Sequence, residues 1–204
     1  MSTKKTSRSS GKEKVTVFRR AFPSPLSSFI DYLNEVTEEF TDPEILVSRI
    51  RERMAGILRD PNLVPEQFLR HPLEGFGRNM LIRGRNYIMV CLVWPPGVGS
   101  PVHDHGTWGV AGIFRNRMTI TEYARLDDGT KPEFARLRET KSIEAEAGGV
   151  GIVLPPDREI HKMENRTREL SASLHVYGQE IREAHRFDLK TNKVETFFVP
   201  VTNE

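Results

Sequence analysis

The chain has 204 residues, of which 28% are charged, and its formal net charge is +2. No apolar run approaches the ~20 residues that a transmembrane helix requires, and the polar N-terminus has no apolar segment behind it, so neither a helical membrane protein nor a secretory signal is expected. The single cysteine, Cys91, excludes an intramolecular disulfide and a cysteine-based zinc cluster, and it favours a reducing, cytoplasmic compartment.

Residues 1–15 are predicted to form a disordered basic tail in front of a single domain over residues 16–204. Within residues 1–20, seven lysines and arginines stand against Glu13, a net charge of +6, so the rest of the chain carries −4. A basic arm could bind nucleic acid or a membrane surface. The tail has no aromatic residue before Phe18 and is rich in Ser, Thr and Lys, which favours a solvated segment. We therefore expect neither nucleic acid nor membrane as a partner.

A helical segment is predicted over about residues 24–70. Ser24 and Pro25 are typical of a helix start, and apolar residues follow them at helical spacing. Residues 41–44 form a second start, before a longer amphipathic helix, and residues 64–69 add a short third one. The apolar stripes of these helices are expected to face the core.

Short strand-like runs separated by turns follow from residue 76. They cover residues 78–83, 86–94, 108–114, 117–125, 133–143, 150–154, 159–164, 169–177, 183–189 and 194–199. Residues 127–129 (Asp-Asp-Gly) and 148–149 (Gly-Gly) are strong turn signals between them. Many short strands at near-regular spacing predict a mainly β sandwich or barrel behind the helical segment.

Three histidines are candidate metal ligands. His103 and His105 are separated by one residue, and on a strand such neighbours point to the same face. His161 ends a run that contains a proline turn, and a return strand there would bring it to the same spot. Three imidazoles accept iron, nickel, manganese or zinc, so the pattern predicts a divalent-metal site without choosing the metal.

A row of polar side chains lies on one later strand. Ser173, His175 and Tyr177 share one face by the same alternation. Such a row can simply satisfy its own hydrogen bonds in a buried strand, or it can orient a catalytic hydroxyl. The metal pattern elsewhere in the chain favours the catalytic interpretation.

Together these motifs resemble those of the cupin superfamily and, within it, the thiol dioxygenases. The two halves of the cupin pattern read Gly97-x5-His103-x-His105 and Pro156-x4-His161-x3-Asn165. Many cupins place a glutamate after the His-x-His pair, but residues 107–110 contain none, and a three-histidine site resembles that of the thiol dioxygenases. Residues 173–177 resemble their Ser-x-His-x-Tyr triad, and residues 76–79 resemble their substrate-arginine segment. The resemblance spans about residues 75–190 and implies a cupin double-stranded β-helix (jelly-roll) barrel over about residues 76–200, with the helices outside.

The activity implied by the resemblance is the oxidation of a small carboxylated thiol, of the cysteine or 3-mercaptopropionate type, by O2 to its sulfinic acid. The implied Fe(II) ligands are His103, His105 and His161, and the implied catalytic triad is Ser173, His175 and Tyr177. Three neutral imidazoles leave open positions on the metal for a thiolate sulfur and O2. Tyr177 would hydrogen-bond O2 or the substrate carboxylate, and His175 with Ser173 would fix its hydroxyl.

Two arginines are candidates to bind the substrate carboxylate. Arg78 lies in the segment that carries the resemblance, and a planar guanidinium can bind a carboxylate through two hydrogen bonds. Arg186, nine residues after Tyr177, resembles an arginine that some mercapto-acid dioxygenases recruit. If Arg78 alone faces the metal, a monocarboxylic thiol is expected, and if both do, mercaptosuccinate is the better candidate. Trp108 could wall the pocket or fill the core.

The chain departs from mammalian cysteine dioxygenases at two places. Residues 106–110 lack the cysteine that cross-links to the triad tyrosine, and Phe76 stands where a tyrosine is frequent. Both changes weaken the expectation that L-cysteine itself is the substrate. The alternatives are a non-catalytic cupin that senses a metal or a small acid and, ranked last, a nucleic-acid binder that uses the tail. Ser173, His175 and Tyr177 argue against the sensor, and the sequence leaves the oligomeric state open.

Overall fold

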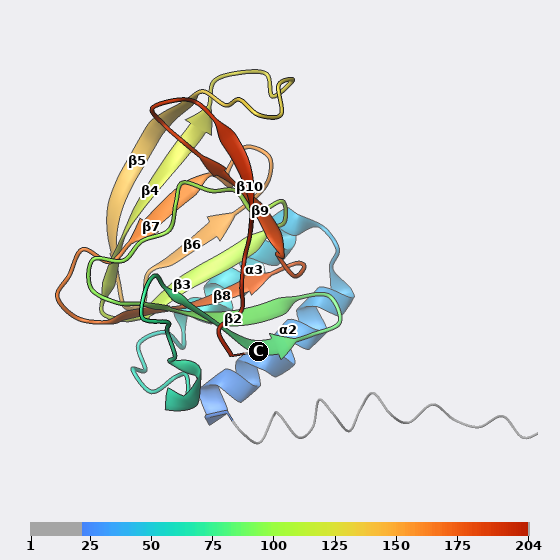
Figure 1. Cartoon of the computed structure of the whole chain (residues 1–204). Helices are drawn as coiled ribbons and strands as arrows, with labels where there is room; N and C mark the ends of the chain where they lie inside the picture. The colour runs from blue at the N-terminus through green and yellow to red at the C-terminus, as the bar shows by residue number, and fades with distance from the viewer. Residues whose placement is uncertain (1–21, 204) are drawn as a thin grey trace, which may run out of the picture.

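A computed structural model describes residues 22–203, with helices first and strands after them (Figure 1). The tail predicted over residues 1–15 lies outside the described residues. Within residues 22–203 no helix is long and apolar enough to cross a membrane.

The helical segment consists of α2 (Ser24–Glu39), α3 (Pro43–Ala55) and the short 3-10 helix η1 (Glu66–Phe68). The carboxylate of Asp42 accepts a hydrogen bond from the backbone N–H of Glu44, and a proline opens the first turn of α3. The predicted helices are therefore present, and their starts agree with the sequence signals to within a residue or two.

Ten strands follow, and each overlaps one predicted run. They are β1 (Gly77–Arg83), β2 (Ile88–Trp94), β3 (Gly109–Arg115), β4 (Arg117–Arg125), β5 (Leu137–Glu146), β6 (Val150–Val153), β7 (His161–Glu164), β8 (Ser171–Tyr177), β9 (Glu183–Phe187) and β10 (Val194–Phe198). A five-stranded sheet has the order β1-β2-β8-β3-β6, a three-stranded sheet the order β5-β4-β7, and β9 pairs with β10. The predicted mainly β architecture with helices outside is confirmed.

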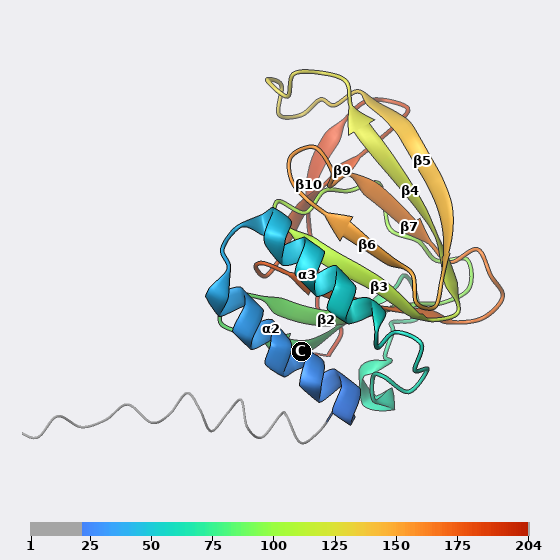
Figure 2. The ribbon, with the colours of Figure 1, turned by 180° about the vertical axis from the view of Figure 1, so that it is seen from behind.

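The helices cover the outer face of the five-stranded sheet (Figure 2). Apolar residues of α2 and α3 form one cluster with alternate residues of the central strands, including Met89, Cys91 and Leu174. Gly112 on β3 allows this close packing, because a Cβ atom there would lie only 2.8 Å from Sδ of Met54 on α3. The outer face of the sheet is therefore an ordinary apolar core.

The opposite face of the same strands lines the interior of a barrel, because it packs on Met118 of β4 and Met163 of β7 in the three-stranded sheet. All seven residues of β2 and of β8 are buried, so these central strands have no face exposed to water. On β2 the inward residues, such as Val90 and Trp94, belong to a second apolar cluster. On β8 the alternation that sends Leu174 outward directs Ser173 and His175 inward. The polar row is therefore held inside the barrel.

Candidate metal centre

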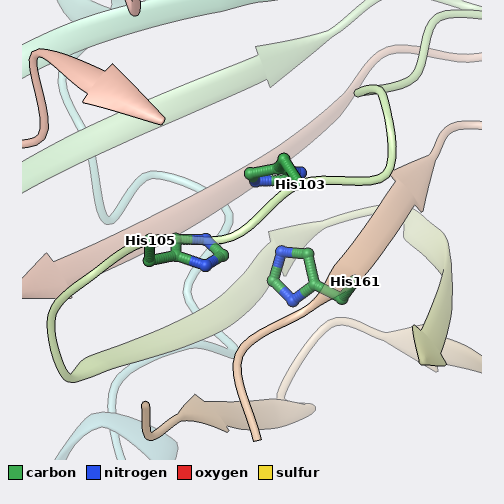
Figure 3. A group of neighbouring side chains, drawn as sticks. All are labelled: His103, His105 and His161. Carbon is green, nitrogen blue, oxygen red and sulfur yellow. The ribbon is translucent and has the colours of Figure 1, made fainter. Parts of the chain in front are cut away.

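The three predicted metal ligands come together (Figure 3). His103 and His105 lie on the connection between β2 and β3, which is irregular apart from isolated bridges such as that at His103, and His161 is the first residue of β7. The bridge joins His103 to His161 through backbone hydrogen bonds of 3.0 and 3.1 Å in the two directions. One nitrogen from each imidazole can be chosen so that all three lie within 4.8 Å of one another. One metal ion could bind all three.

Backbone carbonyls determine which ring nitrogens of His103 and His105 face the common space. Nδ1 of His103 lies 3.0 Å from the carbonyl oxygen of Pro101, and Nδ1 of His105 lies 3.1 Å from that of Glu159. A carbonyl oxygen can only accept, so each Nδ1 carries the proton and each Nε2 keeps a lone pair. Within residues 22–203, Nε2 of His105 is buried without a hydrogen-bond partner, as expected for an atom that binds a metal.

The surroundings keep these imidazoles neutral. Burial lowers the pKa of His103 below its ordinary value of 6.5. Burial, and then repulsion from neighbouring imidazoles, lower the pKa values of His105 and His161 further. A neutral imidazole is the form that binds a metal, so the donor set fits a divalent cation.

Glu159 supports His105 in a way that the sequence did not reveal. Its carboxylate oxygen Oε2 accepts hydrogen bonds from the backbone N–H groups of His105 (3.1 Å) and Gly106 (2.9 Å), and its carbonyl binds the ring. Gly106 has a φ of 62°, a conformation that glycine adopts at low cost. One residue therefore fixes both the backbone and the ring orientation of a ligand.

Asp104, between the two histidines, points toward β9. Its carboxylate accepts hydrogen bonds from the backbone N–H and from Nδ1 of His185, both at 2.8 Å. The backbone N–H of Asp104 in turn donates to the carbonyl oxygen of His185, at 3.2 Å. These three contacts attach the ligand loop to the β9–β10 hairpin.

The predicted polar row forms a buried chain of hydrogen bonds beside the histidines. Oγ of Ser173 lies 2.8 Å from Nε2 of His175, and Nδ1 of His175 lies 2.9 Å from the hydroxyl of Tyr177. Burial, with Arg78 and His103 nearby, lowers the pKa of His175 to about 3, and burial raises the pKa of Tyr177 to about 12. Both side chains are therefore neutral at physiological pH. The ring of Tyr177 stacks against that of His105, with centroids 5.6 Å apart.

A cavity of about 50 Å³ opens against this group. His103, His105 and Tyr177 contribute to its wall, as does Arg78, which is only 4% exposed. The rest of the wall is largely apolar and includes Phe76, Leu92, Ile181, Ala184, Phe197 and Val199. The structure thus brings one of the two candidate arginines to the histidines.

Arg186 and Trp108 do not line this cavity. Arg186 lies on the exposed hairpin, where its guanidinium binds the carboxylate of Glu195 at 2.7 and 2.9 Å. Trp108 packs against the outer apolar cluster and beside Gly178, whose N–H donates to the Trp108 carbonyl. Both residues are close to the site in sequence but are directed elsewhere by the fold.

The chain is similar to a known protein family and, more distantly, to several solved structures. The family described as cysteine dioxygenase type I matches residues 22–190 of the chain. TT1209 from Thermus thermophilus is 13% identical, with a TM-score of 0.43, and the match covers 55% of this chain and 91% of that one.

Two further solved structures are similar over a comparable part of the chain. A conserved protein with a double-stranded β-helix domain from Klebsiella pneumoniae is 15% identical, with a TM-score of 0.42 and coverage of 55% and 84%. A Cupin 2 conserved barrel domain protein from Salinispora arenicola is 19% identical, with a TM-score of 0.40 and coverage of 57% and 85%.

Proposed function

Because the chain belongs to the cysteine dioxygenase type I family, we propose that it oxidises a small carboxylated thiol with O2 to its sulfinic acid, using Fe(II). Both oxygen atoms are added to the sulfur, so that a thiolate and one O2 give one sulfinate. The observation that carries the proposal is the set of three neutral imidazoles beside a cavity with a buried arginine. The single buried cysteine and a free thiol substrate both suit a reducing, cytoplasmic compartment.

The metal would be held by His103, His105 and His161. Three neutral ligands leave its full charge of +2, which favours the thiolate over the thiol. Bound Fe(II) would supply a redox-active centre that accepts a thiolate and lets it react with O2.

Arg78 would bind the substrate carboxylate. Its side chain is buried in the cavity wall, where a guanidinium pairs strongly with a carboxylate because little water competes. Arg186 already binds Glu195 on the exposed hairpin, so a second cation for a second carboxylate is not supported. We therefore favour a monocarboxylic thiol such as cysteine or 3-mercaptopropionate over mercaptosuccinate.

Tyr177 would act on the reacting atoms through its hydroxyl. Its pKa of about 12 keeps the phenol protonated, so that it can donate a hydrogen bond to O2 or to the carboxylate. His175 and Ser173 hold the phenol in place from behind and do not line the cavity.

Oxygen uptake by the Fe(II)-loaded protein tests the proposal directly. With cysteine, 3-mercaptopropionate and mercaptosuccinate as substrates, we expect turnover of at least one monocarboxylate at a higher kcat/KM than mercaptosuccinate. His161→Ala should lose iron and activity together. Absence of uptake with all three thiols, or full iron occupancy in His161→Ala, would overturn the proposal.

A further inference from the structure

The last described residues, 199–203, form a segment that we call the C-terminal strap. The chain leaves β10 and reaches β1, the edge strand of the five-stranded sheet, where Thr202 and Asn203 bind the backbone of that strand. The N–H of Val199 donates to the carbonyl oxygen of Arg182, at 2.9 Å, which anchors the start of the strap. The strap lies beyond residues 22–190, the part of the chain that matches the family.

The strap completes the hydrogen bonding of β1 at the position of Arg78. The N–H of Arg78 donates to Oγ1 of Thr202 at 2.9 Å, and its carbonyl oxygen accepts from the N–H of Thr202 at 2.7 Å. The side-chain amide of Asn203 repeats this pattern with the backbone of Met80, at 2.8 and 3.0 Å. Four hydrogen bonds therefore hold the backbone from which the Arg78 side chain enters the cavity.

The strap also supplies part of the cavity wall. Val199 lines the cavity, next to Phe197 at the end of β10. Val199 and Val201 both pack against the second apolar cluster, which contains Val90 and Trp94, but Val201 does not line the cavity. The cavity is small, at about 50 Å³, so the side chains in its wall restrict the size of a ligand.

We propose that the C-terminal strap determines which thiol acids the site accepts, with Val199 as the residue that limits chain length. This inference rests on the proposed function, because it assumes that the carboxylate binds Arg78 and the sulfur lies at the histidines. The ligand would extend from Arg78 to the histidines. Thr202 and Asn203 fix the backbone at the Arg78 end, and Val199 forms part of the cavity wall. The substrate class is therefore a short thiol monocarboxylate.

Binding of two homologous acids tests the inference without turnover. Calorimetry on the Fe(II)-loaded protein without O2 would give the affinities for 3-mercaptopropionate and for 4-mercaptobutyrate, which is one methylene longer. One methylene in an apolar pocket changes discrimination by about ten-fold or more. Val199→Ala should therefore shift the affinity ratio about ten-fold toward the longer acid, and Val199→Leu should shift it the opposite way. The matched control, Val201→Ala, should leave the ratio within about three-fold.

The possible outcomes distinguish a failure of the strap inference from a failure of the proposed dioxygenase function. Equal ratios in the wild type, Val199→Ala and Val201→Ala would overturn the inference, as would a wild type that binds neither acid. If Val199→Ala failed to fold, an unchanged ratio in Val199→Leu would overturn it as well. The expected shifts without any oxygen uptake by the wild type would refute the dioxygenase function and leave the strap as the selective wall. Oxygen uptake by the wild type with unchanged affinity ratios would support the dioxygenase function and overturn the role of the strap.

Discussion

Nε1 of Trp94 lies 2.9 Å from Oγ of Ser173, and this contact gives the buried hydrogen-bond chain a direction. An indole N–H can only donate, so Oγ of Ser173 accepts from it. Ser173 is fully buried, and its own hydroxyl hydrogen finds an acceptor in Nε2 of neutral His175. Nδ1 of His175 then carries the proton and donates to the oxygen of Tyr177. The phenolic hydrogen of Tyr177 is thereby left to donate into the cavity.

The first prediction is that, in Trp94→Phe, the hydrogen bonds of this chain no longer have one fixed direction. Phenylalanine can keep the stacking on Phe76, where the ring centroids are now 4.6 Å apart, but it cannot donate to Ser173. Nitrogen-15 NMR of the imidazoles should show the Nδ1–H tautomer of His175 in the wild type and a mixture in the variant. Loss of one net hydrogen bond, about 1 kcal/mol, predicts a fall in kcat of roughly five-fold. An Nε2–H tautomer in the wild type would contradict the assigned direction.

The second prediction compares the two candidate arginines. Arg78→Ala should lower kcat/KM for a carboxylated thiol, because the substrate carboxylate would be left in an apolar wall without its partner. Truncating one member of a buried charge pair costs about 2–5 kcal/mol, or roughly thirty-fold or more in kcat/KM. Arg186→Ala serves as the control and should change kcat/KM by less than about three-fold. Equal effects of the two substitutions would remove Arg78 as the carboxylate-binding residue.

The third prediction concerns the support of His105 by Glu159. Glu159→Ala removes the acceptor for two backbone N–H groups of the ligand loop. Loss of such a supporting contact typically weakens metal binding about 10- to 100-fold, and competition titration with a chelator would measure this. Glu159→Gln keeps an acceptor oxygen, so its metal affinity should fall less. Glu183→Ala, at an exposed position of β9, should keep the wild-type metal affinity. An unchanged affinity in Glu159→Ala would show that the loop is held by other contacts.

The fourth prediction is a pH dependence of stability in the metal-free protein. The pKa of His175 is about 3 in the folded protein, against an ordinary value of 6.5. Between these pH values the unfolded chain binds a proton that the folded protein does not, so the free energy of unfolding falls as the pH falls below 6.5.

Urea unfolding at pH 7 and pH 5 would measure this decrease. Relative to the wild type, His175→Gln should show a smaller decrease, by up to about 1.4 kcal/mol per pH unit. The matched control for the loss of a histidine is His71→Gln, at an exposed position away from the buried row. A His175→Gln slope equal to that of the wild type would contradict the shifted pKa.

Local sequence patterns predicted the helices and strands, and they picked out three histidines that lie together, although His103 and His105 are on an irregular connection and not on the expected strand. Continuous apolar runs marked strands such as β2, which is buried on both faces, and the period of two placed Ser173, His175 and Tyr177 together. The prediction for β5 was displaced, because Phe134 and Ala135 are apolar but their backbones pair with residues 192–193 and not with β4.

The supporting contacts of the site could not be predicted in this way. Glu159 and His105 are 54 residues apart, Trp94 and Ser173 are 79 apart, and Arg78 and Thr202 are 124 apart. Such pairs arise from the path of the chain around the barrel and leave no periodic trace in the sequence. Arg186 illustrates the converse, since its spacing from Tyr177 suggested a role in the site and an ion pair with Glu195 holds it outside.

The central claim, that the protein adds both atoms of O2 to one thiol sulfur, is tested most directly by isotope labelling. The Fe(II)-loaded protein would be given 3-mercaptopropionate or cysteine under oxygen-18 gas, and the product would be analysed by mass spectrometry. The account predicts a sulfinic acid in which both sulfur-bound oxygen atoms are oxygen-18. A disulfide product, or a sulfinic acid with one or both oxygen atoms derived from water, would contradict it.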